Sequence, residues 1–350
     1  MAEADGIERS LDGELALYVR ALDGADSNAA VDVVTSLLDD GVDALVVMVR
    51  IVAAAQRLIG ERWQRGEWSV AREHAATGVS MAATGAIGAF VRSIPLTGGK
   101  VVIGCAEREW HALPAMVVNY GLRARGWDVT YLGAATSPTR LAAVLQEVGP
   151  DATAVSCSVL SSLPSGRGFI EASTGAGIPV VAGGSAFGSD DVRAMALGAT
   201  AWASTAFDAI EVIPTLPAVV APAPSLPAEP LAEQRTMELN HHLLATTLRE
   251  RWERDHCVAE CAPHDAEDVE VVVENVVEQV LHALQVALVT GDDRVIDETI
   301  GWTAELLRTR GFPSRLLSGL GGLLLRELHE YPLAAGLVEA HWRVPEPLVP

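Results

Sequence analysis

The sequence predicts an α/β protein with additional all-α regions: an N-terminal helical bundle, a parallel β-sheet covered by helices, and a C-terminal helical domain. Three observations support this fold class. Apolar residues recur at three- and four-residue spacing over residues 10–94 and again over 231–345. Between these regions, over 99–213, short apolar runs bounded by Gly and Pro alternate with helical patterns. Six prolines, interleaved mostly with alanine, make residues 214–230 an extended linker.

The composition fits a multidomain protein with large hydrophobic cores. Of its 350 residues 49% are hydrophobic, and the formal net charge is −21. Since phosphate groups require clustered cations, we expect no nucleic-acid binding by this chain and no membrane association. No uninterrupted apolar run reaches the roughly 18 residues of a membrane span. The acidic first residues are unlike a secretion signal, and four cysteines are too few for a disulfide framework, so we expect a cytoplasmic protein.

Two long helices are predicted in the first region. One begins near Asp43 and continues to Ile59, with apolar residues at positions 45, 48, 49, 52, 55, 58 and 59. The other begins after Ser69, a good N-cap residue, and ends near Val91. Its many Ala, Gly and Ser residues predict close approach by another helix or by a flat ligand.

In the last region an apolar stripe predicts a long helix from Val269 to about Leu288, with glutamates on its other side. Further helices are expected over residues 294–309 and 314–330, separated by Gly311-Phe312-Pro313.

Four apolar runs predict parallel strands, and the loops after them are where a ligand is expected. The runs cover residues 101–104, 128–133, 152–156 and 179–184. In open parallel sheets, ligands bind beyond the carboxyl ends of the strands. The loops of interest therefore begin at Cys105, Gly133, Ser156 and Gly183.

Residues suited to ligand binding follow three of these strands. Glu109 and His111 lie two residues apart after the first strand. A neutral imidazole binds transition metals well, and a carboxylate on its other ring nitrogen fixes the tautomer. Small hydroxyl side chains follow the third strand, and a glycine pair that allows close backbone approach follows the fourth, at Ser156, Ser158, Gly183 and Gly184.

Residues 99–213 resemble the cobalamin-binding Rossmann-like domains, whose fingerprint is Asp/Glu-x-His-x-x-Gly, Ser-x-Leu and Gly-Gly. The matching segments are Glu109-Trp110-His111, Ser158-Val159-Leu160 (with Ser156 as an alternative anchor) and Gly183-Gly184. Pro114 departs from the fingerprint where Gly is expected, although proline is tolerated in a first helical turn. The resemblance implies cobalamin with His111 on the lower face of cobalt and its nucleotide tail between the serines and the glycines.

The first region adds a second resemblance. Trp63, nine intervening residues and then Glu73-His74 match the signature of light-sensing, adenosylcobalamin-dependent regulators of the CarH type. This resemblance implies that Trp63 covers the adenosyl group and that Glu73 bonds to it. It also implies that His74 can take the upper cobalt position once light has broken the cobalt–carbon bond. Those regulators begin with a basic DNA-binding domain, whereas the bundle here starts within about ten residues of Met1.

The last region offers a cysteine- and histidine-rich segment, His256, Cys257, Cys261 and His264. A zinc site, contact with a tetrapyrrole, and ordinary surface residues are three open interpretations. We expect no special role for His241, His242, His282 and His329.

The order of a capped cobalamin module, a Pro/Ala linker and an acidic helical domain resembles the photocobilins. This implies a photoreceptor, not an enzyme, whose helical domain over 231–345 binds biliverdin. We expect a homo-oligomer that acts on a downstream signalling protein. The alternatives are a corrinoid carrier of a methyltransferase system, a cobalamin sensor that does not respond to light, and a C-terminal bundle used for dimerisation or partner docking.

Overall fold

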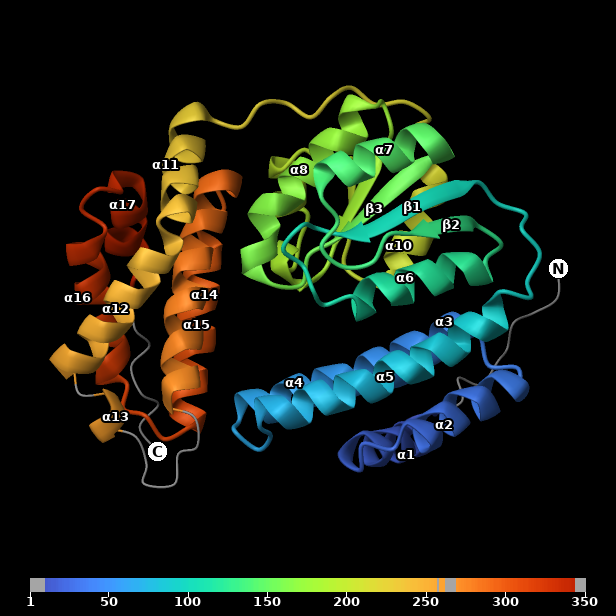
Figure 1. Cartoon of the computed structure of the whole chain (residues 1–350), viewed down its shortest axis with the longest axis horizontal. Coiled ribbons are helices and arrows are strands. Elements are labelled where there is room, and N and C mark those ends of the chain that lie inside the picture. The colour runs from blue at the N-terminus through green and yellow to red at the C-terminus, as the bar shows by residue number, and fades with distance from the viewer. Residues whose placement is uncertain (1–9, 257, 262–268, 344–350) are drawn as a thin grey trace. The chain divides into compact units, whose positions relative to one another are not determined.

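The computed structural model describes residues 10–256, 258–261 and 269–343 (Figure 1). The chain divides into two compact units. The first consists of residues 1–101 and 112–131, and the second of residues 102–111 and 132–350.

The first unit is mainly helical. Its elements are α1 (Asp12–Asp23), α2 (Ser27–Asp39), α3 (Ala44–Val47), the π-helix η1 (Met48–Ala53), α4 (Ala54–Gln64), α5 (Val70–Val91), α6 (Leu113–Ala124) and strand β2 (Asp128–Tyr131). The predicted helix from Asp43 is confirmed, since the Asp43 carboxylate accepts a hydrogen bond from the Leu45 amide at 2.9 Å. The continuous helix α3–η1–α4 contains the π-helical segment, which apolar spacing does not reveal.

Helix α5 confirms its predicted limits, and at one of its glycines another helix packs closely. The Ser69 hydroxyl accepts a hydrogen bond from the Arg72 amide at the N-terminus of the helix. At Gly88 the helix packs so closely on α6 that an added Cβ would lie 2.3 Å from the ring of Tyr120. Close approach by another helix is thus confirmed at Gly88, whereas an added Cβ at Gly78 or Gly85 would meet no atom within 4 Å.

A five-stranded sheet has the order β2-β1-β3-β4-β5. Besides β2, its strands are β1 (Lys100–Cys105), β3 (Ala152–Ser156), β4 (Val180–Gly183) and β5 (Ala201–Ala203). The four predicted strands are all present, whereas β5 was not predicted. Strands β3, β4 and β5 are parallel, and Ser156 is paired in register with Gly183. The candidate loops after β3 and β4 thus start at the same level of the sheet.

Helices connect the strands of the second unit, as expected for a doubly wound sheet. They are α7 (Pro138–Val148), η2 (Leu160–Ser162), α8 (Leu163–Gly175), η3 (Ser185–Phe187), α9 (Val192–Ala196), α10 (Ala206–Val212) and η4 (Ile213–Thr215). The described residues 216–227 form neither helix nor strand. This segment is nevertheless held at two points, because Arg167 donates to the Pro224 carbonyl at 2.6 Å and the Ala223 amide donates to Thr174 at 3.0 Å.

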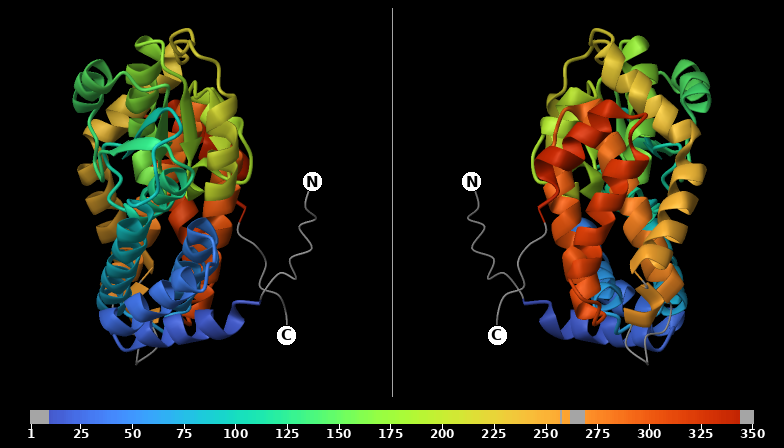
Figure 2. Two further views of the ribbon diagram at one scale, coloured as in Figure 1. Left: turned by 90° about the vertical axis from the view of Figure 1, so that its right-hand side faces the viewer. Right: turned by 90° about the vertical axis from the view of Figure 1, so that its left-hand side faces the viewer.

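The C-terminal helices also belong to the second unit. They are α11 (Ala228–Leu239), α12 (His241–His256), α13 (Val258–Cys261), α14 (Val269–Thr290), α15 (Arg294–Thr309), α16 (Arg315–Glu327) and α17 (Pro332–His341). The predicted helices over 269–288 and 294–309 are confirmed. The helix predicted over 314–330 corresponds to α16, which ends at Glu327. Helix α17 follows as a separate element. The two helices, drawn in red, contact each other (Figure 2).

Helix α14 is the centre of this helical group. It contacts α11, α12, α15 and α17, and every residue from Ala283 to Thr290 is buried. It also contacts η2, α8 and α9 of the sheet region. By length and composition, α5 and α14 are apolar enough to cross a membrane, but buried helices of soluble proteins meet the same criterion.

Candidate functional site

Glu109 is the buried centre of the loop that follows β1. Its side chain is 0% exposed, and its two oxygens accept several hydrogen bonds. The donors are the His111 amide at 2.8 Å, the Ser158 amide, the Val159 amide at 3.2 Å and the Ser162 hydroxyl at 3.0 Å. These donors satisfy a charge that would otherwise be costly to bury, and they join the loop after β1 to the loop after β3.

The same carboxylate orients the imidazole of His111. Oε1 of Glu109 lies 2.7 Å from Nδ1 of His111. Burial alone would raise the pKa of Glu109, but the hydrogen bonds from His111 and Ser158 outweigh it and hold the pKa below its ordinary value. An ionised Glu109 accepts the proton on Nδ1, so Nε2 is the nitrogen that can donate a lone pair to a metal.

Ser158 provides an independent sign of a ligand in this region. Its hydroxyl oxygen is buried and has no hydrogen-bond partner within the described part of the chain. A buried hydroxyl without a partner is costly, so a polar group of a ligand would stabilise it. Ser156 is buried at the end of β3, and Leu160 is half-buried at the start of η2. The residues present therefore fit a corrinoid with a polar nucleotide tail.

The two glycines at the end of β4 are required by the protein itself. Gly184 has a φ of +108°, and a Cβ there would lie 2.2 Å from the carbonyl oxygen of Cys157. A Cβ at Gly183 would lie 3.1 Å from the carbonyl oxygen of Ala203. Close backbone packing thus accounts for the pair without a ligand.

Trp110, another predicted site residue, is 75% exposed.

The predicted upper-face residues lie on the adjoining helices α4 and α5 of the first unit. Trp63 is half-buried near the end of α4, Glu73 lies in the first turn of α5, and His74 beside it has a side chain that is 73% exposed. Oε2 of Glu73 is 3.8 Å from Nε2 of His74. An exposed imidazole next to a carboxylate has the freedom to change its partner.

Sequence reasoning missed a polar chain behind Glu73. Thr77 donates to Glu73 at 2.8 Å and lies 3.2 Å from the Gln56 oxygen. The Gln56 amide donates to Ser80 at 2.7 Å, and Tyr18 donates to the same hydroxyl at 3.2 Å. Three of these residues are one turn apart on α5, at positions 73, 77 and 80, which is the signal that could have identified them.

The predicted cysteine- and histidine-rich segment is only partly described. His256 packs against α16, where a Cβ on Gly319 would lie 2.4 Å from its ring. Cys261 accepts a hydrogen bond from Arg315 at 3.2 Å. Cys257 and His264 lie outside the described residues. The described potential metal ligands that do converge are instead His241, Glu278 and His282, two of which were expected to have no role.

Comparisons with known proteins agree with these observations. Two models, each described as a B12 binding domain, match residues 99–211 and 15–87. None of the curated proteins shows significant similarity to this sequence. The monomethylamine corrinoid protein of Methanosarcina barkeri superposes with a TM-score of 0.50 at 16% identity, over 58% of this chain and 98% of that protein.

Two further solved structures are less similar in three dimensions. The methanol:cobalamin methyltransferase complex of Methanosarcina barkeri gives a TM-score of 0.32 at 18% identity, over 61% of this chain and 85% of that one. A cobalamin-binding protein of Desulfitobacterium hafniense DCB-2 gives a TM-score of 0.32 at 21% identity, over 57% of this chain and 97% of that protein. From the two matching domain models, the chain contains a pair of B12-binding domains, a helical cap and a Rossmann-like sheet domain, and it binds cobalamin or a related corrinoid.

Proposed function

We propose that this protein is a photoreceptor in which adenosylcobalamin is the light-sensitive group. The observation that carries the proposal is the placement of Trp63, Glu73 and His74 on the adjoining helices α4 and α5 of the cap. A carrier of a methyl group has no need of a large aromatic residue and an acid–histidine pair at this spacing. An adenosyl group, by contrast, offers an aromatic base and ribose hydroxyls that such residues can bind.

On the lower face, His111 would hold cobalt through Nε2 while Glu109 keeps the ring oriented. The buried hydroxyl of Ser158 would bond to the nucleotide tail. Bound adenosylcobalamin supplies a cobalt–carbon bond that light can break. The hydrogen bonds that Glu109 receives from the loop after β3 make the position of His111 depend on the loop that would hold the tail.

On the upper face, Thr77 holds the Glu73 carboxylate, while the exposed His74 has fewer restraints. We infer that Glu73 would hold the adenosyl group of the bound cofactor and that His74 would be the residue available to ligate cobalt once that group is lost. The loss of the adenosyl group would change the packing of the cap, which is the change that a second domain or a partner can detect.

We extend the proposal to the C-terminal helices α11–α17, to which we assign biliverdin binding. The basis is the order of domains, together with the half-buried His256 on α12 and Cys261 on α13. The proposal includes a cytoplasmic homo-oligomer, no membrane or nucleic-acid partner for this chain, and a downstream signalling protein.

The second candidate is a corrinoid carrier of a methyltransferase system. The superposition on the monomethylamine corrinoid protein favours it, although at 16% identity this similarity concerns the fold. The two candidates differ in what the cap must recognise: a carrier accommodates methylcobalamin, whereas the proposed photoreceptor prefers the adenosyl form.

The test is to load the full chain with adenosylcobalamin or methylcobalamin in the dark, measure both affinities, and illuminate with green light. Trp63→Ala should abolish the preference for adenosylcobalamin. His74→Ala should alter the photoproduct spectrum, whereas His329→Ala, at another exposed histidine, should leave it unchanged. Equal affinities of the wild type for the two forms would favour the carrier.

Biliverdin added to the same samples should give a red-shifted absorbance band if the C-terminal helices bind it.

A further inference from the structure

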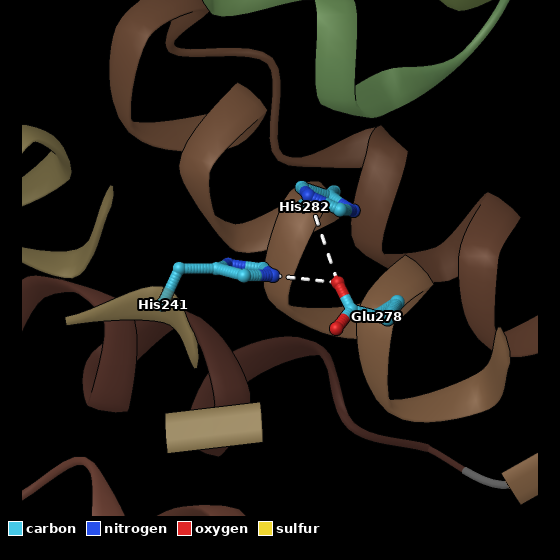
Figure 3. A group of neighbouring side chains, drawn as sticks. All are labelled: His241, Glu278 and His282. Atoms are coloured by element: carbon cyan, nitrogen blue, oxygen red, sulfur yellow. Dashed lines mark hydrogen bonds and ion pairs between the residues drawn. The ribbon is translucent and has the colours of Figure 1, made fainter. Parts of the chain in front are cut away.

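Three potential metal ligands converge from two helices of the C-terminal domain (Figure 3). His241 is the first residue of α12, and Glu278 and His282 lie on α14. Nε2 of His241 is 2.5 Å and Nε2 of His282 is 3.9 Å from Oε2 of Glu278. One ligand atom from each residue can be chosen so that all three lie within 4.8 Å of one another.

The packing of α12 on α14 fixes this arrangement. Glu278 and His282 are four residues apart, so they share one face of α14. The rings of His241 and His282 stack with centroids 4.6 Å apart and an interplanar angle of 17°. All three side chains are half-buried, so they are ordered by their neighbours and still accessible to an ion from solvent.

A chain of amides supports His241 from the side opposite Glu278. Gln285 lies 3.1 Å from Nδ1 of His241 and accepts a hydrogen bond from Gln234, which also donates to Glu238. Gln285 and Gln234 are both buried, so the protein holds two polar side chains in its interior to position one imidazole. If the Gln285 amide rotates about its last bond, its oxygen can accept a hydrogen bond from Nδ1–H of His241 while Nε2 binds a metal; this bond replaces the one that Gln285 accepts from Gln234.

We propose that His241, Glu278 and His282 form a binding site for a divalent transition-metal ion, in the first instance Zn²⁺. Two imidazoles and one carboxylate are a ligand set that zinc uses in sites where a fourth position is left for water or another ligand. Glu278 and His282 are four residues apart on α14, and His241 comes from the neighbouring α12. Ligands placed in this way can converge on one ion, as a tetrahedral site requires.

The surrounding charges are compatible with a bound cation. The nearby guanidinium groups are already paired, Arg108 with Glu238 at 2.6 Å and Arg249 with Glu274 at 3.3 Å. They therefore leave Glu278 available to balance the charge of an ion.

The site would join α12 to α14 close to the loops that carry His111. Helix α14 contacts η2, whose Ser162 donates a hydrogen bond to Glu109. Arg108, in the same loop as Glu109, forms its ion pair with Glu238 of α11. A metal that fixes α12 on α14 would therefore stabilise the helices that support this loop, independently of any response to light.

The experiment uses the full chain, freed of metal with a chelator and titrated with Zn²⁺ in competition with a chromophoric chelator. The wild type should bind one Zn²⁺ per chain, and its melting temperature should rise with the Zn²⁺ concentration. Glu278→Gln should weaken binding at least about 100-fold, because it removes the anionic ligand with little change of shape. His241→Gln and His282→Gln should have similar effects.

Two matched controls separate ligand loss from general damage. Glu270→Gln makes the same change two turns earlier on α14, at an exposed residue, and His242→Gln changes the exposed neighbour of His241. Both should bind Zn²⁺ within about 3-fold of the wild type, a range typical of contextual effects at surface positions. The metal-free Glu278→Gln variant should retain the circular dichroism spectrum of the wild type.

Three results would overturn the proposal. The first is a wild type that binds no stoichiometric Zn²⁺. The second is a folded Glu278→Gln variant that retains wild-type affinity. The third is loss of binding in Cys261→Ser but not in Glu278→Gln, which would assign the ion to the cysteine- and histidine-rich segment instead.

Discussion

Arg193 and Asp292 form a buried ion pair between the sheet region and the C-terminal helices. Nε of Arg193 donates to Oδ2 of Asp292 at 2.9 Å, and the two side chains are only 2% and 3% exposed. Arg193 lies on α9, whereas Asp292 lies in the turn between α14 and α15. Arg193 also donates to Glu298 at 2.6 Å, and Arg294 donates to Asp292 at 2.7 Å. The pair is therefore part of a hydrogen-bonded network that connects the two regions.

Replacement of Arg193 by methionine should destabilise the protein by about 3 kcal/mol, because it leaves a buried carboxylate with one partner fewer. The free energy of unfolding in urea measures this loss. Arg308→Met is the matched control, since Arg308 forms an exposed pair with Glu305 and its replacement should leave stability unchanged. Equal stability of the Arg193→Met variant and the wild type would mean that the pair adds nothing to the attachment of the helices.

The contribution of Asp292 should depend on pH. Burial raises the pKa of this carboxyl, but the hydrogen bonds and charges of Arg294 and Arg193 outweigh it and hold the pKa below its ordinary value. A lowered pKa in the folded state stabilises the protein above the unfolded-state pKa of about 3.9, and this stabilisation is lost as the pH falls through the folded-state pKa. The advantage of the wild type over Asp292→Asn should therefore be full near neutrality and shrink below about pH 4. An advantage that stays constant down to low pH would contradict this.

Local sequence patterns were sufficient for much of the fold and for the contact between Glu109 and His111. The Ser69 cap and four strands depend on contiguous residues, so they could be identified directly. Glu109 and His111 are two residues apart, and the hydrogen bond between them forms within one loop. Ser162 was missed as a partner of Glu109 because 53 residues separate them in sequence.

Tertiary structure supplied what the sequence could not. Strand β5 was missed because it has only three residues, Ala201–Ala203, and its pairing with β4 defines it. His241 and Glu278 are 37 residues apart, on helices whose packing no periodicity reveals. His282 in isolation has no feature that distinguishes a ligand from an ordinary half-buried histidine, so the candidate metal site emerged only from the structure.

The glycines should differ in their tolerance of alanine. Gly184→Ala combines a positive φ with a contact of 2.2 Å to the Cys157 carbonyl, so we expect it to destabilise the protein most. Gly133→Ala isolates the cost of positive φ, of order 1–3 kcal/mol, because no atom lies within 4 Å of its Cβ. Gly183→Ala meets the Ala203 carbonyl at 3.1 Å without an unfavourable φ and should cost less than Gly184→Ala. Urea denaturation gives the order, and a Gly184→Ala variant no less stable than Gly133→Ala would contradict it.

Replacement of Glu109 by glutamine should affect both stability and corrinoid binding. Each carboxylate oxygen accepts hydrogen bonds, so either orientation of the amide would place an NH₂ group against existing donors. We expect a loss of about 1–3 kcal/mol in the free energy of unfolding, and a corrinoid affinity at least about 10-fold weaker. Glu107→Gln, at an exposed position in the same loop, should change neither quantity. If Glu109→Gln bound adenosylcobalamin like the wild type, Glu109 would have no role in orienting His111.

The cysteines should react with iodoacetamide at rates that reflect their burial. Cys105 and Cys157 are both 0% exposed, and burial raises the pKa of each thiol, in Cys105 to about 12. Since the thiolate is the reactive form, neither should be modified in the folded protein at mildly alkaline pH. Cys261 is half-buried and therefore more accessible to the reagent, so it should react faster than both. Mass spectrometry of tryptic peptides measures each site, and unfolded protein in concentrated guanidinium chloride should show equal modification of all three. Rapid modification of Cys157 in the folded chain would mean that the loop holding Gly184 opens readily, and the close contact at its carbonyl would then not persist in solution.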